Sequence, residues 1–149
     1  MKNHAPNFRR HVGGAAVIEF ALVASLFFML MIGIIELARV MFYWNTATEL
    51  TRMGARIAAV CDIDAGVVAD KVSGFYPLIP RDKVQLSYSP QGCNLSSCAE
   101  VTVSVASGVA INTMIPFLSL NLSLPEFRTT LPRESLQSTF GGVANPVCS

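Results

Sequence analysis

The chain has 149 residues, a formal net charge of +1, 52% hydrophobic residues and 14% charged residues. Typical soluble domains carry about 25% charged residues, so we expect one small domain joined to a strongly apolar segment. The nearly neutral charge gives no support for binding nucleic acid through a basic face, and we expect no nucleic-acid partner.

Residues 1–14 form a polar N-terminal leader that contains Lys2, Arg9 and Arg10. Positively charged residues beside a membrane span favour the cytoplasmic side. We therefore expect a single-pass membrane protein, with its N-terminus in the cytoplasm and its C-terminal part outside it.

An apolar segment follows the leader, and residues 15–44 are charged only at Glu19, Glu36 and Arg39. About 20 apolar residues are enough to cross a bilayer as a helix, so we predict one membrane-spanning helix. A cleaved secretory signal is a weaker interpretation, because its apolar region has only about 7–15 residues. A buried core helix is also weaker, because too little chain remains to cover it.

The predicted helix continues beyond the apolar segment. Tyr43 and Trp44 are typical of a membrane–water interface. Residues 45–61 then repeat small and apolar side chains at three- and four-residue steps, which predicts an amphipathic helix up to Cys61. A helix over residues 15–61 would be about 70 Å long, about twice what the hydrocarbon layer needs. Its second half must therefore pack on its own domain or on neighbouring copies.

Residues 62–149 are expected to form a small head outside the cytoplasm. A short helix capped by Asp64 is predicted over residues 65–75. Three strands are predicted over residues 83–89, 100–106 and 118–124. The first two strands should pair antiparallel. The third could extend toward Leu131, and Pro125 and Pro132 either make it an edge strand or limit its length. The tail from residue 138 is expected to be loose except at Cys148.

The predicted fold class is therefore α+β. A long N-terminal transmembrane helix continues into an amphipathic helix and carries a small C-terminal head built on an antiparallel sheet.

All four cysteines follow the predicted span, on the side of the membrane where disulfides persist. Cys93 and Cys98 are close enough in sequence to close a small loop, which would leave Cys61 to pair with Cys148. Four cysteines allow three pairings, so the connectivity stays open. A zinc site is the weaker alternative, because the histidines lie in the leader. We expect no metal and no cofactor.

Glu19 lies close to the start of the apolar segment. An acidic residue costs roughly 2.5–3.5 kcal/mol at the centre of a membrane and less near its surface, so such residues are functional candidates by default. The alternative is that the Glu19 carboxylate simply reaches the membrane surface. Gly14, five residues earlier, favours the functional interpretation.

These residues carry a family resemblance. Gly14 followed by Glu19 and Phe20 resembles the processing site of type IV prepilins. Residues 33–39 resemble the end of the membrane span of TadE-like proteins, and residues 51–59 resemble the helix that follows it. The chain is therefore similar to the TadE-like pseudopilins of tight-adherence (Flp) pilus systems.

The resemblance implies that a prepilin peptidase cleaves after Gly14 and frees the amine of Ala15. It also implies that Glu19 pairs with the Ala15 amine of a neighbouring subunit, which would offset its desolvation. The implied partners are the peptidase, other pilin-like subunits, the pilus assembly platform and the lipid bilayer. The implied role is pilus biogenesis, adhesion and biofilm formation. The chain would then consist of a cleavable leader, a long helix and a head: residues 1–14, 15–61 and 62–149.

Several alternatives remain open from the sequence. Glu36 and Arg39, three residues apart, can pair within the helix or between subunits. The whole protein could instead be an unprocessed single-span anchor for a binding head, or a pseudopilin of a type II-like secretion system. We expect no enzyme activity. The serines are scattered and lack a nucleophile elbow, and no histidine follows the span.

Overall fold

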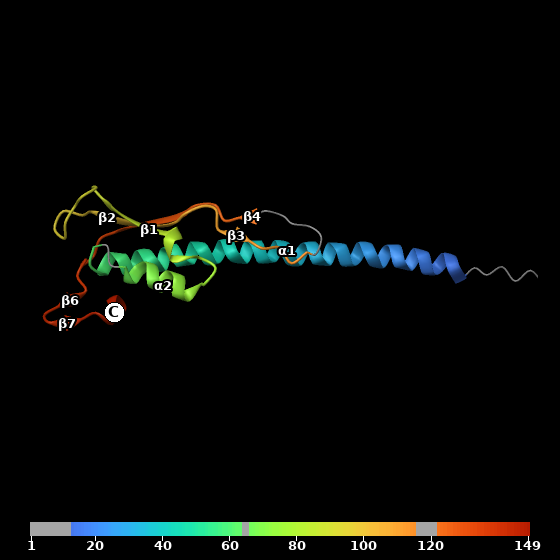
Figure 1. Cartoon of the computed structure of the whole chain (residues 1–149), viewed down its shortest axis with the longest axis horizontal. Helices are drawn as coiled ribbons and strands as arrows, with labels where there is room; N and C mark the ends of the chain where they lie inside the picture. The colour runs from blue at the N-terminus through green and yellow to red at the C-terminus, as the bar shows by residue number, and fades with distance from the viewer. Residues whose placement is uncertain (1–12, 64–65, 116–121) are drawn as a thin grey trace, which may run out of the picture. The chain divides into compact units, whose positions relative to one another are not determined.

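The computed structural model describes residues 13–63, 66–115 and 122–149. The chain divides into two compact units, Met1–Leu37 and Ala38–Ser149. Figure 1 shows the helices and strands of the described residues. A long N-terminal apolar helix is followed by a small antiparallel sheet, so the α+β fold class predicted from the sequence is confirmed.

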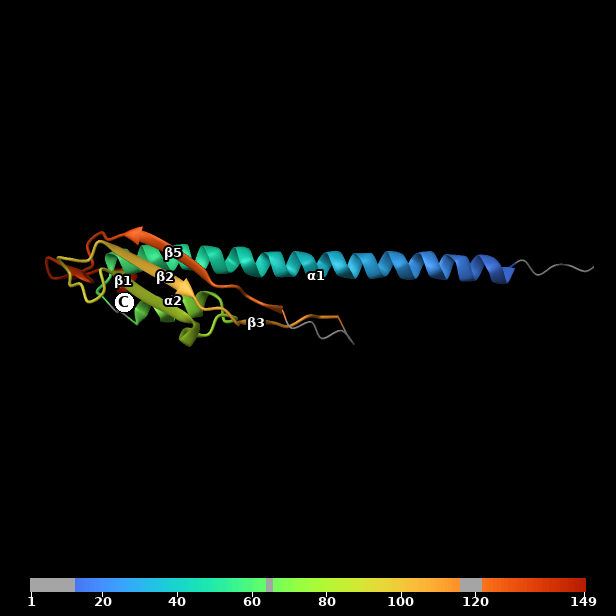
Figure 2. The same cartoon turned by 90° about the horizontal axis from the view of Figure 1, so that it is seen from above.

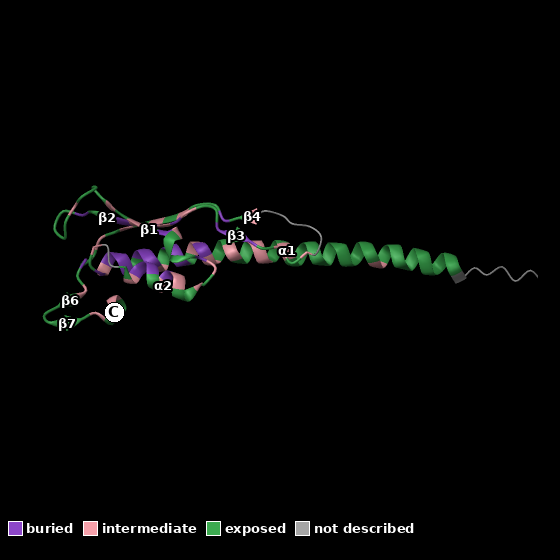
Figure 3. Cartoon of the chain, in the orientation of Figure 1, coloured by how far each residue is buried: buried purple, intermediate pink, exposed green. Residues whose placement is uncertain are grey.

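Helix α1 extends over Gly13–Val60. The sequence predicted a start at residue 15, whereas the helix also includes Gly13 and Gly14. Its first part is exposed, whereas its second part is partly buried (Figure 3). The buried apolar side chains of the second part are Ala47, Leu50, Ala55, Ile57, Ala58 and Ala59. The predicted amphipathic continuation therefore packs on the protein's own head.

The main sheet has three antiparallel strands in the order β1-β2-β5. Strands β1 (Val84–Ser89) and β2 (Glu100–Val105) pair as predicted, with Val84 opposite Val105. Alternate residues of β2 point into the core and are fully buried: Val101, Val103 and Val105. A period of two along the sequence thus marks the inner face of the central strand.

The third strand of this sheet is β5 (Phe127–Pro132), not the predicted segment 118–124. Residues 118–121 lie outside the described part of the chain. Leu122–Ser123 form β4, which pairs with β3 (Ala110–Ile111) in a separate two-stranded ribbon. The prediction was wrong because it followed leucine alternation, whereas β5 directs the polar side chain of Thr129 toward the helix.

The inward position of Thr129 is stabilised by a partner from α1. Its hydroxyl group lies 2.9 Å from the hydroxyl of Thr51, which is itself only 1% exposed. Thr51 also donates a hydrogen bond of 2.8 Å to the carbonyl oxygen of Thr48. A buried polar side chain is tolerated where it is hydrogen-bonded, so a threonine can occupy an inward, half-buried position of this strand.

A second helix, α2, extends over Val67–Phe75 and is followed by the short 3-10 helix η1 at Arg81–Lys83. The predicted cap, Asp64, lies outside the described residues. Gly66 occupies the N-cap position without a side-chain hydrogen bond. An ion pair between Arg81 and Asp70 (2.7 Å) connects η1 to α2 on the exposed surface.

Helix α2 and the buried part of α1 cover the same face of the sheet (Figures 1 and 2). Gly54 of α1 lies against both α2 and the sheet. A Cβ atom at this position would lie 3.0 Å from a methyl group of Val72 and 3.1 Å from one of Val103. The absence of a side chain at Gly54 therefore lets α1 contact both α2 and β2.

The C-terminal tail is ordered into regular elements, so the prediction of a loose tail was wrong. Strands β6 (Thr139–Phe140) and β7 (Val143–Ala144) form a hairpin, and η2 (Pro146–Cys148) follows. The hairpin turns at Gly141 and Gly142, whose φ angles are 59° and 82°. Two consecutive residues with positive φ are what a tight two-residue hairpin turn requires.

Candidate functional site

The predicted processing segment lies in the first turns of α1. Gly14, Ala15, Glu19 and Phe20 are all exposed, and Phe20 is 75% exposed. Ala15 and Glu19 lie four residues apart in the helix, which puts them on one face. A Cβ atom added at Gly14 would meet no atom within 4 Å, so packing within the chain does not explain a glycine here.

The apolar part of α1 has the properties of a membrane span. Its 18-residue window has a mean hydropathy of 2.5, and none of that window is buried. Leaving one large apolar side chain in water costs about 1.5–3 kcal/mol, and this part of α1 exposes a long series of them, among them Leu22, Phe27, Met29 and Ile34. In the part of the chain that the structure describes, α1 is the one helix long and apolar enough to cross a membrane. The protein therefore fits a single-pass membrane protein.

Arg39, close to the end of the apolar segment, connects α1 to the head. One guanidinium nitrogen (Nη2) lies 3.1 Å from the Tyr43 hydroxyl oxygen and 3.3 Å from the carbonyl oxygen of Asn112, and donates to both. The guanidinium carbon also lies 5.7 Å from the centre of the Tyr43 ring. The sequence proposed Glu36 as the partner of Arg39, and that ion pair stays a prediction. The contact with Asn112 was missed, because no local pattern links residues so far apart.

Tyr43 in turn contacts Tyr76, with their ring centres 6.2 Å apart. Burial raises the pKa of Tyr76 above its ordinary value of 10.0, and the nearby Tyr43 hydroxyl raises it further. The positive charge of Arg39 lowers the pKa of Tyr76, but this is the smaller influence. The Tyr76 phenol is therefore neutral at physiological pH.

The four cysteines form two disulfides, Cys61–Cys148 and Cys93–Cys98. This is the pairing that the sequence favoured among the three it allowed. Cys61 comes directly after α1, so the first disulfide attaches the C-terminus to the end of that helix. The second closes the loop between β1 and β2.

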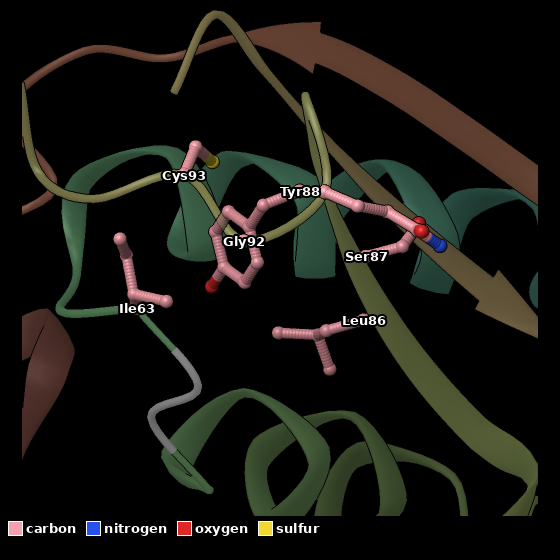
Figure 4. A pocket seen from close by; sticks show the side chains of 7 residues that line it. Ile63, Leu86, Ser87, Tyr88, Gly92 and Cys93 are labelled. Atoms are coloured by element: carbon pink, nitrogen blue, oxygen red, sulfur yellow. The ribbon is translucent and has the colours of Figure 1, made fainter. Parts of the chain in front are cut away.

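The head also has an open pocket of about 280 Å³ beside β1 (Figure 4). Its lining residues are Ile63, Leu86, Ser87, Tyr88, Gln91, Gly92 and Cys93. None of these residues carries a charge, and the sulfur of Cys93 is held in a disulfide.

Comparison with known proteins identifies the long helix. A family model described as TadE-like protein matches residues 14–56. The match begins at Gly14 and covers both the apolar part of α1 and most of its buried part. The chain has no match among curated proteins or among solved structures.

The TadE-like match over α1 supports the interpretation of the chain as a pilin-like protein associated with a pilus. The resemblance of this chain to the TadE-like family is thus confirmed over residues 14–56.

Proposed function

We propose that this protein is a minor pilin-like component of a tight-adherence (Flp) pilus assembly system. It would be inserted in the bacterial inner membrane with its N-terminus in the cytoplasm and its head outside. A prepilin peptidase would remove residues 1–14 after Gly14. The mature subunit would have a structural role, without catalysis, in pilus biogenesis and so in adhesion and biofilm formation.

The observation that carries this proposal is the family match that begins at Gly14, with Glu19 five residues later. The match supports a TadE-like helix, and the spacing of these two residues resembles that of a prepilin processing site. The basic residues Lys2, Arg9 and Arg10 suit a leader held at an anionic cytoplasmic surface.

The position of Gly14 at the start of α1 suits cleavage by a peptidase. A peptidase must bind its cleavage site in an extended form, whereas Gly14 lies in the first turn of α1. Glycine destabilises a helix by about 1 kcal/mol relative to alanine, so it makes local unwinding at the bond between Gly14 and Ala15 easier. A larger side chain would meet no neighbour there, so a substitution at Gly14 tests the peptidase without disturbing the fold.

The position of Glu19 supports assembly with neighbouring subunits. Its side chain is exposed in the isolated chain and lies on an otherwise apolar surface. In a membrane its charge is costly unless a positive group approaches it. Cleavage after Gly14 would create such a group, the Ala15 amine, and a neighbouring copy could bring it to Glu19.

The test is the intact mass of the protein extracted from membranes of cells that contain a prepilin peptidase. We expect a mass that lacks residues 1–14, and the full-length mass when the peptidase gene is deleted. Gly14→Leu should block cleavage while leaving membrane insertion unchanged.

Gly33→Leu is the matched control, because Gly33 lies in the same helix and a Cβ atom added there would also meet no atom within 4 Å. This variant should be cleaved normally. A wild-type protein that keeps its leader beside an active peptidase would overturn the proposal and favour an unprocessed membrane anchor. Function retained by Gly14→Leu would lead to the same conclusion.

A further inference from the structure

The C-terminal hairpin of β6 and β7 carries two large apolar side chains on one face. Phe140 and Val143 lie directly opposite each other across the hairpin, and they are 83% and 73% exposed. The side chains of two directly paired residues point to the same face of a β ribbon. No charged side chain follows Glu134 in the sequence. The hairpin therefore presents a small, uncharged, apolar face to its surroundings.

The fold holds this hairpin in place although the hairpin adds nothing to the core. All of its strand residues are exposed, and an isolated hairpin is marginally stable at best in water. Its base is closed by a backbone hydrogen bond of 2.8 Å from Asn145 to Ser138, and the disulfide of Cys148 to Cys61 follows it. An apolar face that is fixed in position but left exposed is typical of a contact surface.

The pocket beside β1 is a receiving surface in the same unit. The side chains of Ile63, Leu86 and Tyr88 point into it (Figure 4), and none of its lining residues is charged. A cavity of about 150 Å³ holds a benzene ring, so a pocket of about 280 Å³ has room for the phenyl ring of Phe140 and the methyl groups of Val143. One chain therefore carries an uncharged apolar hairpin face and an uncharged pocket of suitable size.

The strand beside this pocket is open to a neighbour. β1 is an edge strand of the three-stranded sheet, and its six residues include no charged residue and no proline. Charged residues and proline are the usual means by which proteins protect an edge strand from other chains. The other edge strand, β5, has both, Arg128 and Pro132. Of the two edges, β1 is therefore the one suited to contact with another chain.

The hairpin and the pocket lie at the same end of the unit Ala38–Ser149. Ser138, at the base of the hairpin, is hydrogen-bonded to Asp62, and the next residue, Ile63, lines the pocket. In a pair of copies related by a two-fold axis, each hairpin can face the pocket of the other copy, so the contact forms twice.

The area of such a double contact is sufficient for a specific pair. An aromatic side chain buries about 150–250 Å² when it is covered. Two contacts built on Phe140 and Val143, counted on both partners, would bury roughly 1,000 Å², which is the area that a specific interface needs. The absence of charge on both surfaces means that no ionised group loses its water in the contact.

We propose that the β6–β7 hairpin of one copy inserts Phe140 and Val143 into the pocket beside β1 of a second copy of this chain. The inference deepens the proposed structural role in assembly, on which it rests, by naming a surface through which two heads pair. The disulfide between Cys61 and Cys148 then has a further role, because it fixes the position of the inserted hairpin.

The experiment uses an equal mixture of unlabelled and ¹⁵N-labelled full-length chain, reconstituted in phosphatidylethanolamine–phosphatidylglycerol vesicles. The photo-cross-linker p-benzoylphenylalanine takes the place of Phe140, and mass spectrometry identifies the cross-linked peptides after irradiation. Cross-links between the two isotopes can come only from different copies. We expect such cross-links between position 140 and residues 84–93. The control carries the cross-linker in place of Phe75, an aromatic residue of the same unit that is 65% exposed, and should give few mixed-isotope cross-links to residues 84–93.

A second measurement is the dissociation constant of the pair in detergent, by sedimentation equilibrium. Phe140→Asp should raise this constant at least about tenfold, as the loss of a central interface residue does, whereas Phe75→Asp should leave it unchanged. Gln91 lines the pocket, so the double variant Phe140→Asp/Gln91→Lys places opposite charges together and should recover part of the affinity. Recovery by a second substitution would show that Phe140→Asp does not act through misfolding.

The other outcomes overturn the inference. Cross-links confined to one isotope would show that the hairpin contacts its own chain, and mixed-isotope cross-links to other residues would exclude the pocket. An absence of cross-links, or a dissociation constant that Phe140→Asp leaves unchanged, would exclude the contact altogether. None of these measurements needs a prepilin peptidase, so each result would leave the proposed cleavage after Gly14 unaffected. A chain that pairs as expected but keeps its leader beside an active peptidase would overturn only the proposed function.

Discussion

The backbone amide of Glu134 donates a hydrogen bond of 3.0 Å to the carbonyl oxygen of Ala59, in the last turn of α1. The last carbonyl groups of a helix have no partner within the helix, and the last turn of α1 contains no basic side chain. The segment after β5 supplies the missing donors. Gln137 donates its backbone amide to Val60 (2.9 Å), and Ser135 donates its hydroxyl to the same oxygen (3.0 Å).

The same segment is attached at two further points. Asp62 and Ser138 exchange hydrogen bonds of 3.0 Å, each backbone amide donating to the other's side chain. Ten residues after Ser138, Cys148 closes the disulfide to Cys61. The C-terminal segment therefore caps the helix, and the disulfide holds this cap in place.

The two disulfides should contribute differently to the free energy of unfolding, because they close loops of different length. Cys61–Cys148 joins residues 87 apart in sequence, and Cys93–Cys98 joins residues 5 apart. Loop-closure entropy predicts a loss of about 4–5 kcal/mol of unfolding free energy without the first and about 2 kcal/mol without the second. Urea unfolding of the detergent-solubilised chain, comparing Cys61→Ser/Cys148→Ser with Cys93→Ser/Cys98→Ser, measures both. Equal losses would contradict the argument from loop-closure entropy.

Gly54→Ala should destabilise the head although alanine favours helix. The new methyl group would lie 3.0 Å from Val72 and 3.1 Å from Val103, and overpacking of a core costs about 1–3 kcal/mol. The higher helix propensity of alanine offsets about 1 kcal/mol of this cost. We therefore expect a small net loss of unfolding free energy in the same urea experiment. Gly33→Ala, which meets no neighbour, is the control and should not lower stability. A Gly54→Ala protein more stable than wild type would show that α2 and β2 can move apart freely.

Thr51→Val should cost about 1–3 kcal/mol of unfolding free energy, because it leaves the half-buried hydroxyl of Thr129 without its acceptor. The double variant Thr51→Val/Thr129→Val removes both hydroxyls and should recover part of the loss. The measurement is a double-mutant cycle in urea. Additive losses in the double variant would mean that the two hydroxyls are not coupled.

Alkaline pH should weaken the head through Tyr76. Since burial raises the pKa of this phenol in the folded state above 10.0, the unfolded chain loses the proton first as pH rises. The folded state then binds more protons than the unfolded state. The contribution of Tyr76 to the unfolding free energy is therefore fully present below pH 10, and it is lost as the pH rises through the pKa of the folded state. Tyr76→Phe should flatten this decline, measured by urea unfolding at a series of pH values. An unchanged slope in the variant would assign the decline to other groups.

Glu19→Gln tests the pairing of subunits separately from processing. Insertion and cleavage should be normal, whereas the yield of sheared pili should fall by at least about tenfold, because removing one partner of a buried ion pair costs about 3–5 kcal/mol. Glu49→Gln is the control. Glu49 forms an exposed pair with Arg52 at 3.2 Å, and such pairs contribute at most about 1 kcal/mol. Normal piliation with Glu19→Gln would remove the argument for pairing.

Local patterns were sufficient for the parts of this protein that depend on neighbouring residues. The apolar segment and the amphipathic part of α1 follow from hydropathy and a helical period, and the family match at residues 14–56 confirms the resemblance that began at Gly14. The pairing of β1 with β2 follows from two short alternating segments joined by a nearby loop. Each of these features can be recognised within a few turns of helix or one hairpin.

The features that the sequence did not determine depend on residues far apart. The alternating leucines before Pro125 suggested the wrong third strand. The strand β5 was missed because its inward residue Thr129 is polar and is stabilised by Thr51, 78 residues away. Arg39 contacts Asn112 across 73 residues, and Ser135 caps Val60 across 75. A hydrogen bond between distant residues leaves no periodic signal, so the sequence by itself determined the long apolar helix and its family resemblance, and only the tertiary structure decided how the head closes around the end of that helix.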